Sequence, residues 1–218
     1  VWSSIRLQLI TAVAGFFLIF IVTKMDYRFF SLQGVIKAGY IIAIVLLVAV
    51  FFFDPVRDSH RWIRAGSATF QSSEFAKIIG IIYASAYVAK HKWWYRNPKQ
   101  WFQLLAPVAV IAALILAEPD LSATLCFLGS IVVIMFVSGM PWGFLAAAVG
   151  CLGALIPVMI AIKGYQSRRF SAWLHAWDDP KDVGYQVIQS LYAIGDGGLF
   201  GVGLGNSKQK ITHLPMSD

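Results

Sequence analysis

The stretch that decides the fold is residues 121–162, LSATLCFLGSIVVIMFVSGMPWGFLAAAVGCLGALIPVMIAI, which contains no charged side chain. A helix needs ~20 mostly apolar residues to cross the hydrocarbon core of a bilayer. The ranges 121–140 and 142–162 both have that length. This stretch therefore predicts two consecutive membrane spans.

Four further apolar ranges precede this stretch. The third of them reaches the length of a membrane span only if it includes the segment that holds Glu74 and Lys77. The whole sequence is 58% hydrophobic and 13% charged, whereas soluble domains carry roughly 25% charged residues. We therefore expect an all-α fold, a polytopic integral membrane helical bundle forming a single membrane domain over residues 1–218. Its six or so spans are expected near 7–23, 36–53, 73–89, 101–117, 121–140 and 142–162, with a long extracytoplasmic loop at 163–218.

Lysine and arginine are divided unequally between the two predicted sides of the membrane. Cytoplasmic loops carry an excess of these residues. One side carries seven of them and a single acid: Lys24, Arg28, Lys37, Lys90, Lys92, Arg96 and Lys99, with Asp26. The short loops of the other side carry Arg57, Arg61, Arg64 and Lys77 against five acids: Asp54, Asp58, Glu74, Glu118 and Asp120. We expect the first side to face the cytoplasm, so that residues 163–218 lie outside it.

The net charge of +7 does not call for a nucleic-acid partner. Much of it lies in the segment 90–99, where lysines and arginine alternate with Trp93, Trp94 and Tyr95. Aromatic rings at headgroup depth and cations near anionic lipid are typical of an interfacial anchor. A docking site for a cytoplasmic partner is the alternative.

The segment between the second and third predicted spans holds charges at the membrane edge, where each is costly and therefore a functional candidate. Glu74 and Lys77 are three residues apart, on one helix face, and can pair with each other instead. Arg61 and Arg64 flank Trp62. They could anchor the segment at the membrane interface. Alternatively, the two positively charged side chains could bind a phosphate that lies beside the Trp62 ring.

A second polar cluster, Glu118-Pro119-Asp120, separates the fourth and fifth predicted spans with almost no loop. Pro119 disfavours one continuous helix through this point. Asp120 or Ser122 can cap the helix that follows. The functional alternative is an acidic lining for a cavity, with a metal ion as a further option.

The range 163–218 holds basic residues and a glycine-dense stretch, with room for a short helix at 187–194. Glycines allow close backbone approach, and backbone amides together with Lys208 and Lys210 could bind an anion such as a lipid diphosphate. A merely flexible loop is the alternative.

Several short motifs occur in a fixed order along the chain. They are Arg61-Trp62-Ile63 with Gly66, Phe70-Gln71-Ser72-Ser73-Glu74 with Lys77, Glu118-Pro119-Asp120-Leu121, Arg169-Phe170, Trp177, Asp179-Pro180, Gly184-Tyr185-Gln186, Gln189-Ser190, Gly197-Gly198, 201–207 and Leu214-Pro215. Together they resemble the SEDS family of bacterial shape, elongation, division and sporulation proteins, the group of FtsW, RodA and SpoVE. The stretch GLGNSKQK at 203–210 is more similar to the division and sporulation branch.

The resemblance implies a ten-span glycosyltransferase of the bacterial cytoplasmic (inner) membrane. Such an enzyme polymerises lipid II into glycan strands at the outer face, in cell division or cell-shape maintenance. The chain would then be a fragment covering the second to seventh spans and is not expected to be active alone. The implied partners are lipid II, membrane lipid and a class B penicillin-binding protein, a transpeptidase. A divalent cation, Mg or Mn, could serve as a cofactor by stabilising the departing diphosphate.

The family's proposed catalytic carboxylate lies in a motif of Leu-Pro, three variable residues and Thr-Asp-Phe. Leu214-Pro215 begins this motif, so the base is expected just past the last residue; Asp218 matches only if the loop is two residues shorter. The positions that match those proposed to line or support the substrate cavity are Arg61, Trp62, Glu74, Lys77, Asp120, Arg168, Arg169 and Lys210. The chain departs from the family with Ser72 for Pro, Glu118 for Gln, Ser122 for Gly and Ala123 for Thr.

Two other functions fit the same resemblance. A lipid II flippase needs polar groups along a path through the bilayer, whereas the charges here are expected to gather at the outer edge. A scaffold of the division or elongation machinery, without activity of its own, is favoured if the protein lacks the expected Asp.

Overall fold

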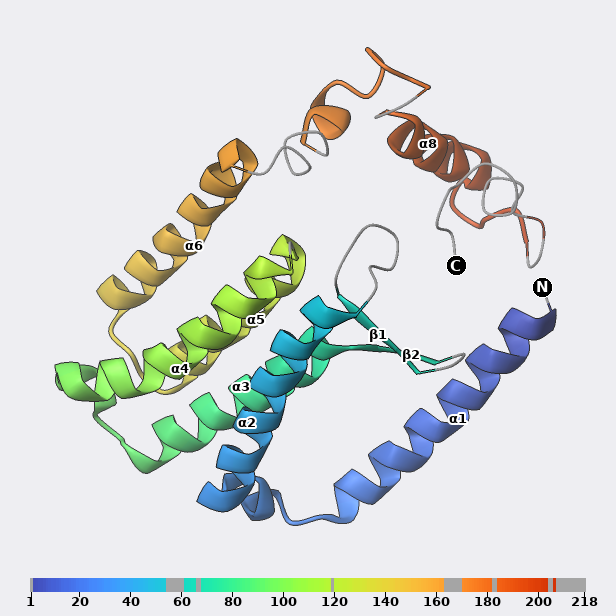
Figure 1. The fold of residues 1–218 in the computed structure, drawn as a ribbon. Helices are drawn as coiled ribbons and strands as arrows, with labels where there is room; N and C mark the ends of the chain where they lie inside the picture. Colours follow the sequence, from blue (N-terminus) through green and yellow to red (C-terminus); the bar gives the residue numbers. More distant parts are fainter. Residues whose placement is uncertain are drawn as a thin grey trace. The chain divides into compact units, whose positions relative to one another are not determined.

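The computed structural model describes residues 2–53, 61–65, 68–118, 120–162, 170–181, 184–203 and 206. These residues are mostly helical (Figure 1), which confirms the all-α class. The chain forms two compact units, Val1–Val149 and Gly150–Asp218.

A helix covers most of each range in which a span is predicted. The α-helices of this part of the chain are α1 (Trp2–Lys24), α2 (Gln33–Ala49), α3 (Ser72–Lys90), α4 (Pro98–Ala117), α5 (Leu121–Val137) and α6 (Trp142–Ile162), and the short 3-10 helices are η1 (Tyr27–Ser31), η2 (Val50–Phe52) and η3 (Trp94–Arg96). By length and apolar composition alone, Gln33–Phe52 and Pro98–Ala117 are able to cross a membrane, with mean hydropathies of 2.7 and 1.9. Three shorter apolar helices accompany them, at Gln8–Lys24, Leu121–Val137 and Trp142–Ala154. The number of spans stays a prediction.

The core of the first unit lies among α2, α3, α4 and α5, which contact one another along the bundle (Figure 1). Leu47, Leu104, Ile111 and Phe127, one or two from each of α2, α4 and α5, are fully buried. Large apolar side chains also cover the outer faces of α1 and α2. An apolar surface that extensive is unfavourable in water and is expected where helices face lipid.

Close packing between α3 and α5 depends on Gly80. A Cβ built on Gly80 would lie 2.6 Å from the Phe127 ring. Phe127 is fully buried and has little room to move. We expect Gly80→Ala to lower the free energy of unfolding by about 1–3 kcal/mol, since overpacking a close contact forces strain into the neighbours.

The matched control is Gly129→Ala, because Gly129 lies within α5 and a Cβ there has no atom within 4 Å. Alanine is the better helix former, so this change should be neutral or slightly stabilising. Unfolding of the two variants in detergent micelles, followed by circular dichroism, measures the difference. Equal stabilities for both would contradict the packing account.

A β-hairpin between α2 and α3 was not predicted from the sequence. Its strands are β1 (Trp62–Ala65) and β2 (Ala68–Gln71), which pair antiparallel with Trp62 opposite Gln71 and Ile63 opposite Phe70. Aromatic and β-branched side chains favour strands, but each strand has only four residues. The hairpin brings Arg61, just before β1, next to the start of α3.

The described part of the second unit contains α8 (Tyr185–Gly197), within the range predicted as the long loop. It includes the expected short helix at 187–194. Ile188 is its buried residue, and the ring of Tyr192 lies 6.2 Å from that of Trp177. Gly184, the residue before α8, lies so close to Ala176 that a Cβ would come within 1.9 Å of the Ala176 carbonyl oxygen. Residues 185–197 are therefore helical, whereas both anion binding by the rest of the range and its alternative, a flexible loop, stay predictions.

Candidate functional site

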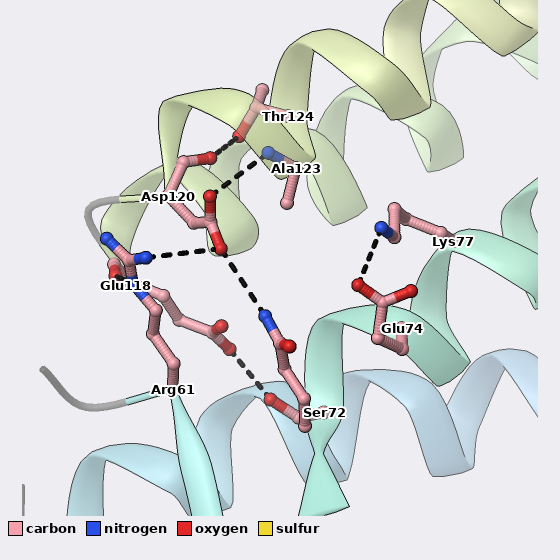
Figure 2. Close-up of polar contacts among 9 residues, drawn as sticks. Arg61, Ser72, Glu74, Lys77, Glu118, Asp120, Ala123 and Thr124 are labelled. Atoms are coloured by element: carbon pink, nitrogen blue, oxygen red, sulfur yellow. Dashed lines mark hydrogen bonds and ion pairs between the residues drawn. The ribbon is translucent and has the colours of Figure 1, made fainter. Parts of the chain in front are cut away.

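Four chain segments bring polar side chains together at one end of the bundle: the residue before β1, the start of α3, the end of α4 and the start of α5 (Figure 2). The buried polar or charged residues of the described chain are all found there: Ser72, Ser73, Glu118, Asp120 and Thr124. Arg61 completes this group, which we call the corner cluster. Glu118 and Asp120 lie at the corner between α4 and α5, where the sequence placed two carboxylates.

Arg61 ties the hairpin to that corner. Its Nε donates a hydrogen bond to the backbone oxygen of Glu118 at 3.1 Å, and its Nη1 lies 3.5 Å from Oδ2 of Asp120. The side chain of Arg61 is 23% exposed and that of Asp120 is 10% exposed. A charge pair this shielded interacts more strongly than one in open water, so the contact fixes where the cation lies.

Asp120 has several partners at once. Its Oδ1 accepts from the backbone N–H of Ala123 at 3.0 Å, which confirms the predicted capping of α5. Its Oδ2 accepts from Nε2 of Gln71 at 3.4 Å as well as facing Arg61. Its backbone oxygen accepts from the Thr124 hydroxyl at 2.8 Å. Capping is therefore one of several roles of Asp120, which also joins β2, the hairpin entry and α5.

Glu118 lies just past the end of α4 and is fully buried. Its Oε1 accepts a hydrogen bond from the Ser72 hydroxyl at 2.9 Å, while Oε2 has no partner among the residues that the structure describes. Burial raises the pKa of Glu118 to about 7, and the charge of Asp120 adds to this; the Ser72 hydrogen bond and Arg61 act in the opposite direction. Near neutral pH this carboxyl is therefore divided between its neutral and ionised forms.

Glu74 and Lys77 form a separate local pair on α3. Lys77 Nζ donates to Glu74 Oε1 at 2.8 Å, as the spacing of three predicted. The Glu74 side chain is 58% exposed. In Figure 2 the pair lies on α3 apart from the Arg61–Asp120 contact. Trp62, the remaining predicted residue that the structure describes, is the first residue of β1, follows Arg61 directly and is half-buried.

The structure thus brings Arg61 and Asp120 together and leaves Glu74 and Lys77 paired with each other. Asp218, Arg168, Arg169 and Lys210 lie outside the described residues. The residues matched to the substrate cavity of the family did not include Gln71, Ser72 or Glu118, although Glu118 was predicted together with Asp120 as a possible acidic lining. The sequence did contain a signal for Glu118. A second carboxylate lies two residues before Asp120, between two apolar ranges, and a charged group at the edge of the membrane costs free energy unless it has partners.

The described residues do not fit a divalent metal. Within the ranges given above, no three His, Cys, Asp or Glu side chains are grouped closely enough to hold one. Both side-chain oxygens of Asp120 already accept from N–H groups or face Arg61. Mg and Mn prefer several oxygen ligands. A role for either ion stays a prediction that concerns residues beyond those described.

The family described as "Cell cycle protein", which comprises FtsW, RodA and SpoVE, matches residues 2–218. The chain belongs to this family. Among its FtsW/RodA/SpoVE relatives, a probable peptidoglycan glycosyltransferase FtsW of Saccharophagus degradans is 38% identical in an alignment over 182 residues that covers 80% of this chain and 46% of that protein. A protein of the same description from Hydrogenovibrio crunogenus is 35% identical over 178 residues, 81% of this chain and 46% of that protein.

A solved structure has a similar fold. Its description reads "Structural coordination of polymerization and crosslinking by a peptidoglycan synthase complex". It superposes on this chain with a TM-score of 0.68 and a sequence identity of 27%, and the match covers 88% of this chain and 57% of that chain. The chain spans about half the length of the curated FtsW relatives that it matches. Membership of the FtsW/RodA/SpoVE family agrees with the predicted resemblance and makes this a membrane protein.

Proposed function

We propose that the protein carrying this chain is a peptidoglycan glycosyltransferase, which polymerises lipid II into glycan strands at the outer face of the bacterial cytoplasmic membrane. The observation that carries the proposal is the family match over residues 2–218, together with relatives more than 30% identical that are named probable peptidoglycan glycosyltransferases. The similar solved structure, described as a peptidoglycan synthase complex, supports it.

The position of the buried polar groups favours chemistry at one surface over transport. Among the described residues these groups gather in the corner cluster, where α4 ends and α3 and α5 begin. The buried positions further along α4 and α5 are apolar, including Ile111, Phe127 and Ile131. A flippase is expected to carry polar groups along its path through the bilayer. The distribution therefore supports the polymerase.

The reaction needs a base and a cationic environment. A sugar hydroxyl loses its proton to a carboxylate while its oxygen bonds to the anomeric carbon of the other substrate. The bond from that carbon to the lipid diphosphate breaks, and the departing diphosphate takes the electron pair. Fixed cations stabilise this negative charge best when they are held in place before the reaction. Arg61, held by Asp120 and the Glu118 carbonyl, is positioned in this way at the predicted outer edge.

The partners proposed for this function are lipid II, with its undecaprenyl diphosphate, and a class B penicillin-binding protein that cross-links the strands. The chemistry of polymerisation accounts for the first. The description of the similar solved structure, in which polymerization and crosslinking are coordinated, supports the second. The predicted location is the bacterial inner membrane, with several spans.

The test is polymerisation of purified lipid II by the full-length protein together with its transpeptidase partner. We expect replacement of the Asp in the Leu-Pro, three residues, Thr-Asp-Phe motif by Asn to lower the rate by roughly a hundredfold or more, as for loss of a general base. Asp218→Asn is the comparison, because Asp218 occupies the third variable position after Leu214-Pro215; if the motif Asp is the base, this variant should keep nearly the natural rate. Unchanged rates in the motif variant would contradict the mechanism, and loss in Asp218→Asn alone would move the base to Asp218.

A further inference from the structure

The first unit contains a second polar feature at the opposite end of α3 from the corner cluster. A cavity of about 400 Å³ lies between the start of α2, the last turns of α3 and the first half of α4. Small-molecule sites have volumes of roughly 300–1,000 Å³. The corner cluster contributes none of the residues that line this cavity, so the two sites are distinct.

Two lysines from different helices line the cavity. Lys37 lies on α2 and Lys90 is the last residue of α3. Across the ranges that the structure describes, neither lysine has an ion-pair partner and no carboxylate is among the lining residues. Two like charges beside one hollow, without a neutralising acid, favour an anion there.

One wall of the cavity is held rigid by hydrogen bonds. Pro107 has no N–H group, so the helix leaves the Gln103 carbonyl without its usual donor. The Tyr83 hydroxyl donates to that carbonyl oxygen, and the Tyr87 hydroxyl donates to Oε1 of Gln103 at 2.9 Å. Both hydroxyl protons are therefore used within the protein. The side-chain donors left for an anion include the two lysines and the amides of Gln33 and Gln103.

His91 completes this wall. Its ring stacks on Tyr87 with the centroids 4.4 Å apart, and its Nδ1 lies 3.0 Å from the Tyr87 backbone oxygen. A carbonyl oxygen can only accept, so Nδ1 carries the hydrogen of this bond. The ring is thereby fixed in one orientation at the rim, with Nε2 as its remaining polar atom.

The surroundings indicate that the anion belongs to a lipid. The segment after α3 places Arg96 over the exposed Trp93 ring, 4.6 Å from its centroid, while Trp94 is buried. An exposed Trp with a cation is typical of headgroup depth. Ile36 and Ala86 give the cavity apolar lining beside the lysines. Basic pockets between spans on the cytoplasmic side bind anionic headgroups, and the charge distribution predicts that this end faces the cytoplasm.

We propose that this cavity binds the phosphate of an anionic phospholipid headgroup, with Lys37 and Lys90 as the cations that recognise it. Neither the proposed polymerisation of lipid II nor the corner cluster is needed for this binding. A bound lipid would link the start of α2 to the end of α3 and would make the protein's stability depend on the composition of the bilayer.

The experiment is native mass spectrometry of the full-length protein, delipidated and titrated with phosphatidylglycerol or with phosphatidylcholine. We expect phosphatidylglycerol to bind preferentially and Lys37→Gln/Lys90→Gln to weaken it roughly tenfold or more, since each lysine near an anionic surface contributes substantially. The matched control is Lys92→Gln/Lys99→Gln, which removes the same charge from the same side but no residue of the cavity. This control should retain the preference.

Equal losses in the two double variants would overturn the proposal, because general surface charge would then explain the binding. Displacement of phosphatidylglycerol by millimolar inorganic phosphate would also overturn it, since the site would then take a free anion. If the double variant fails to fold, the single variant Lys37→Gln decides, because Lys37 is an exposed residue with no structural partner in the described chain. Retained affinity in that variant would overturn the proposal, and weakened binding would support it.

Discussion

Replacing Asp120 with alanine is expected to lower the free energy of unfolding by about 2–4 kcal/mol. The change removes the cap of α5, the partner of Arg61 and the acceptor of Gln71 together. It also removes one of the contacts of the Arg61 guanidinium, which is 23% exposed. The Gln71 amide and the Ala123 N–H each lose a shielded hydrogen-bond acceptor as well, which adds to the cost. Unfolding of the full-length protein in detergent micelles measures the loss.

Two controls separate the parts of this effect. Asp120→Asn keeps an oxygen that can accept from Ala123 N–H, so it should retain the cap and lose the ion pair, with an intermediate loss of stability. Glu74→Ala removes the exposed partner of Lys77 and should cost less than about 1 kcal/mol, as surface pairs do. If Asp120→Ala is no more destabilising than Glu74→Ala, the contacts of Asp120 do not stabilise the packing of the hairpin against α4 and α5.

Much of the helical bundle follows from the hydrophobic pattern alone. A range such as 121–137 has no charged residue, and a helix is the way to satisfy its backbone within lipid. The cap at Asp120 is also local, because a carboxylate before an apolar run can reach the N–H groups of the next turn. These features depend on residues close together in the sequence.

The contacts of the corner cluster depend on residues far apart. Arg61 and Glu118 are 57 positions apart, and Ser72 and Glu118 are 46 apart. Their meeting requires the hairpin to fold between α2 and α3 and then to pack on the end of α4. No periodicity within one segment encodes that arrangement. The cation pair of Lys37 and Lys90 was hidden in the same way, because each residue read alone is an ordinary membrane-edge lysine.

The Glu118→Gln variant is expected to lose a pH dependence of stability that the natural protein has. Glu118 ionises at an ordinary pKa of 4.5 when exposed and at a pKa of about 7 in the folded state, because burial disfavours the charge. Between these two values the folded state holds a proton that the unfolded state has released. Stability from this group is therefore fully present below pH 4.5 and is lost as the pH rises to about 7.

The size of this term follows from the two pKa values. Their separation corresponds to a decrease of at most about 3 kcal/mol in the free energy of unfolding between pH 4.5 and pH 8. Glutamine is nearly the same shape, can still accept from Ser72, and does not ionise in this range. The absolute stability of Glu118→Gln also contains the cost of a buried amide whose N–H groups need partners. The decisive quantity is therefore the difference between the variant and the natural protein as a function of pH.

We expect the two stability profiles to diverge between pH 4.5 and pH 7 and to run parallel above pH 8, with Glu118→Gln gaining relative to the natural protein as the pH rises. Thermal unfolding of the full-length proteins across this range measures the divergence. Glu74→Gln is the matched control, since Glu74 is 58% exposed, and its profile should follow that of the natural protein. Parallel profiles for Glu118→Gln throughout would mean that the carboxyl is solvated or paired beyond the contacts described. A divergence would show that the glutamate makes this corner sensitive to pH where a glutamine does not.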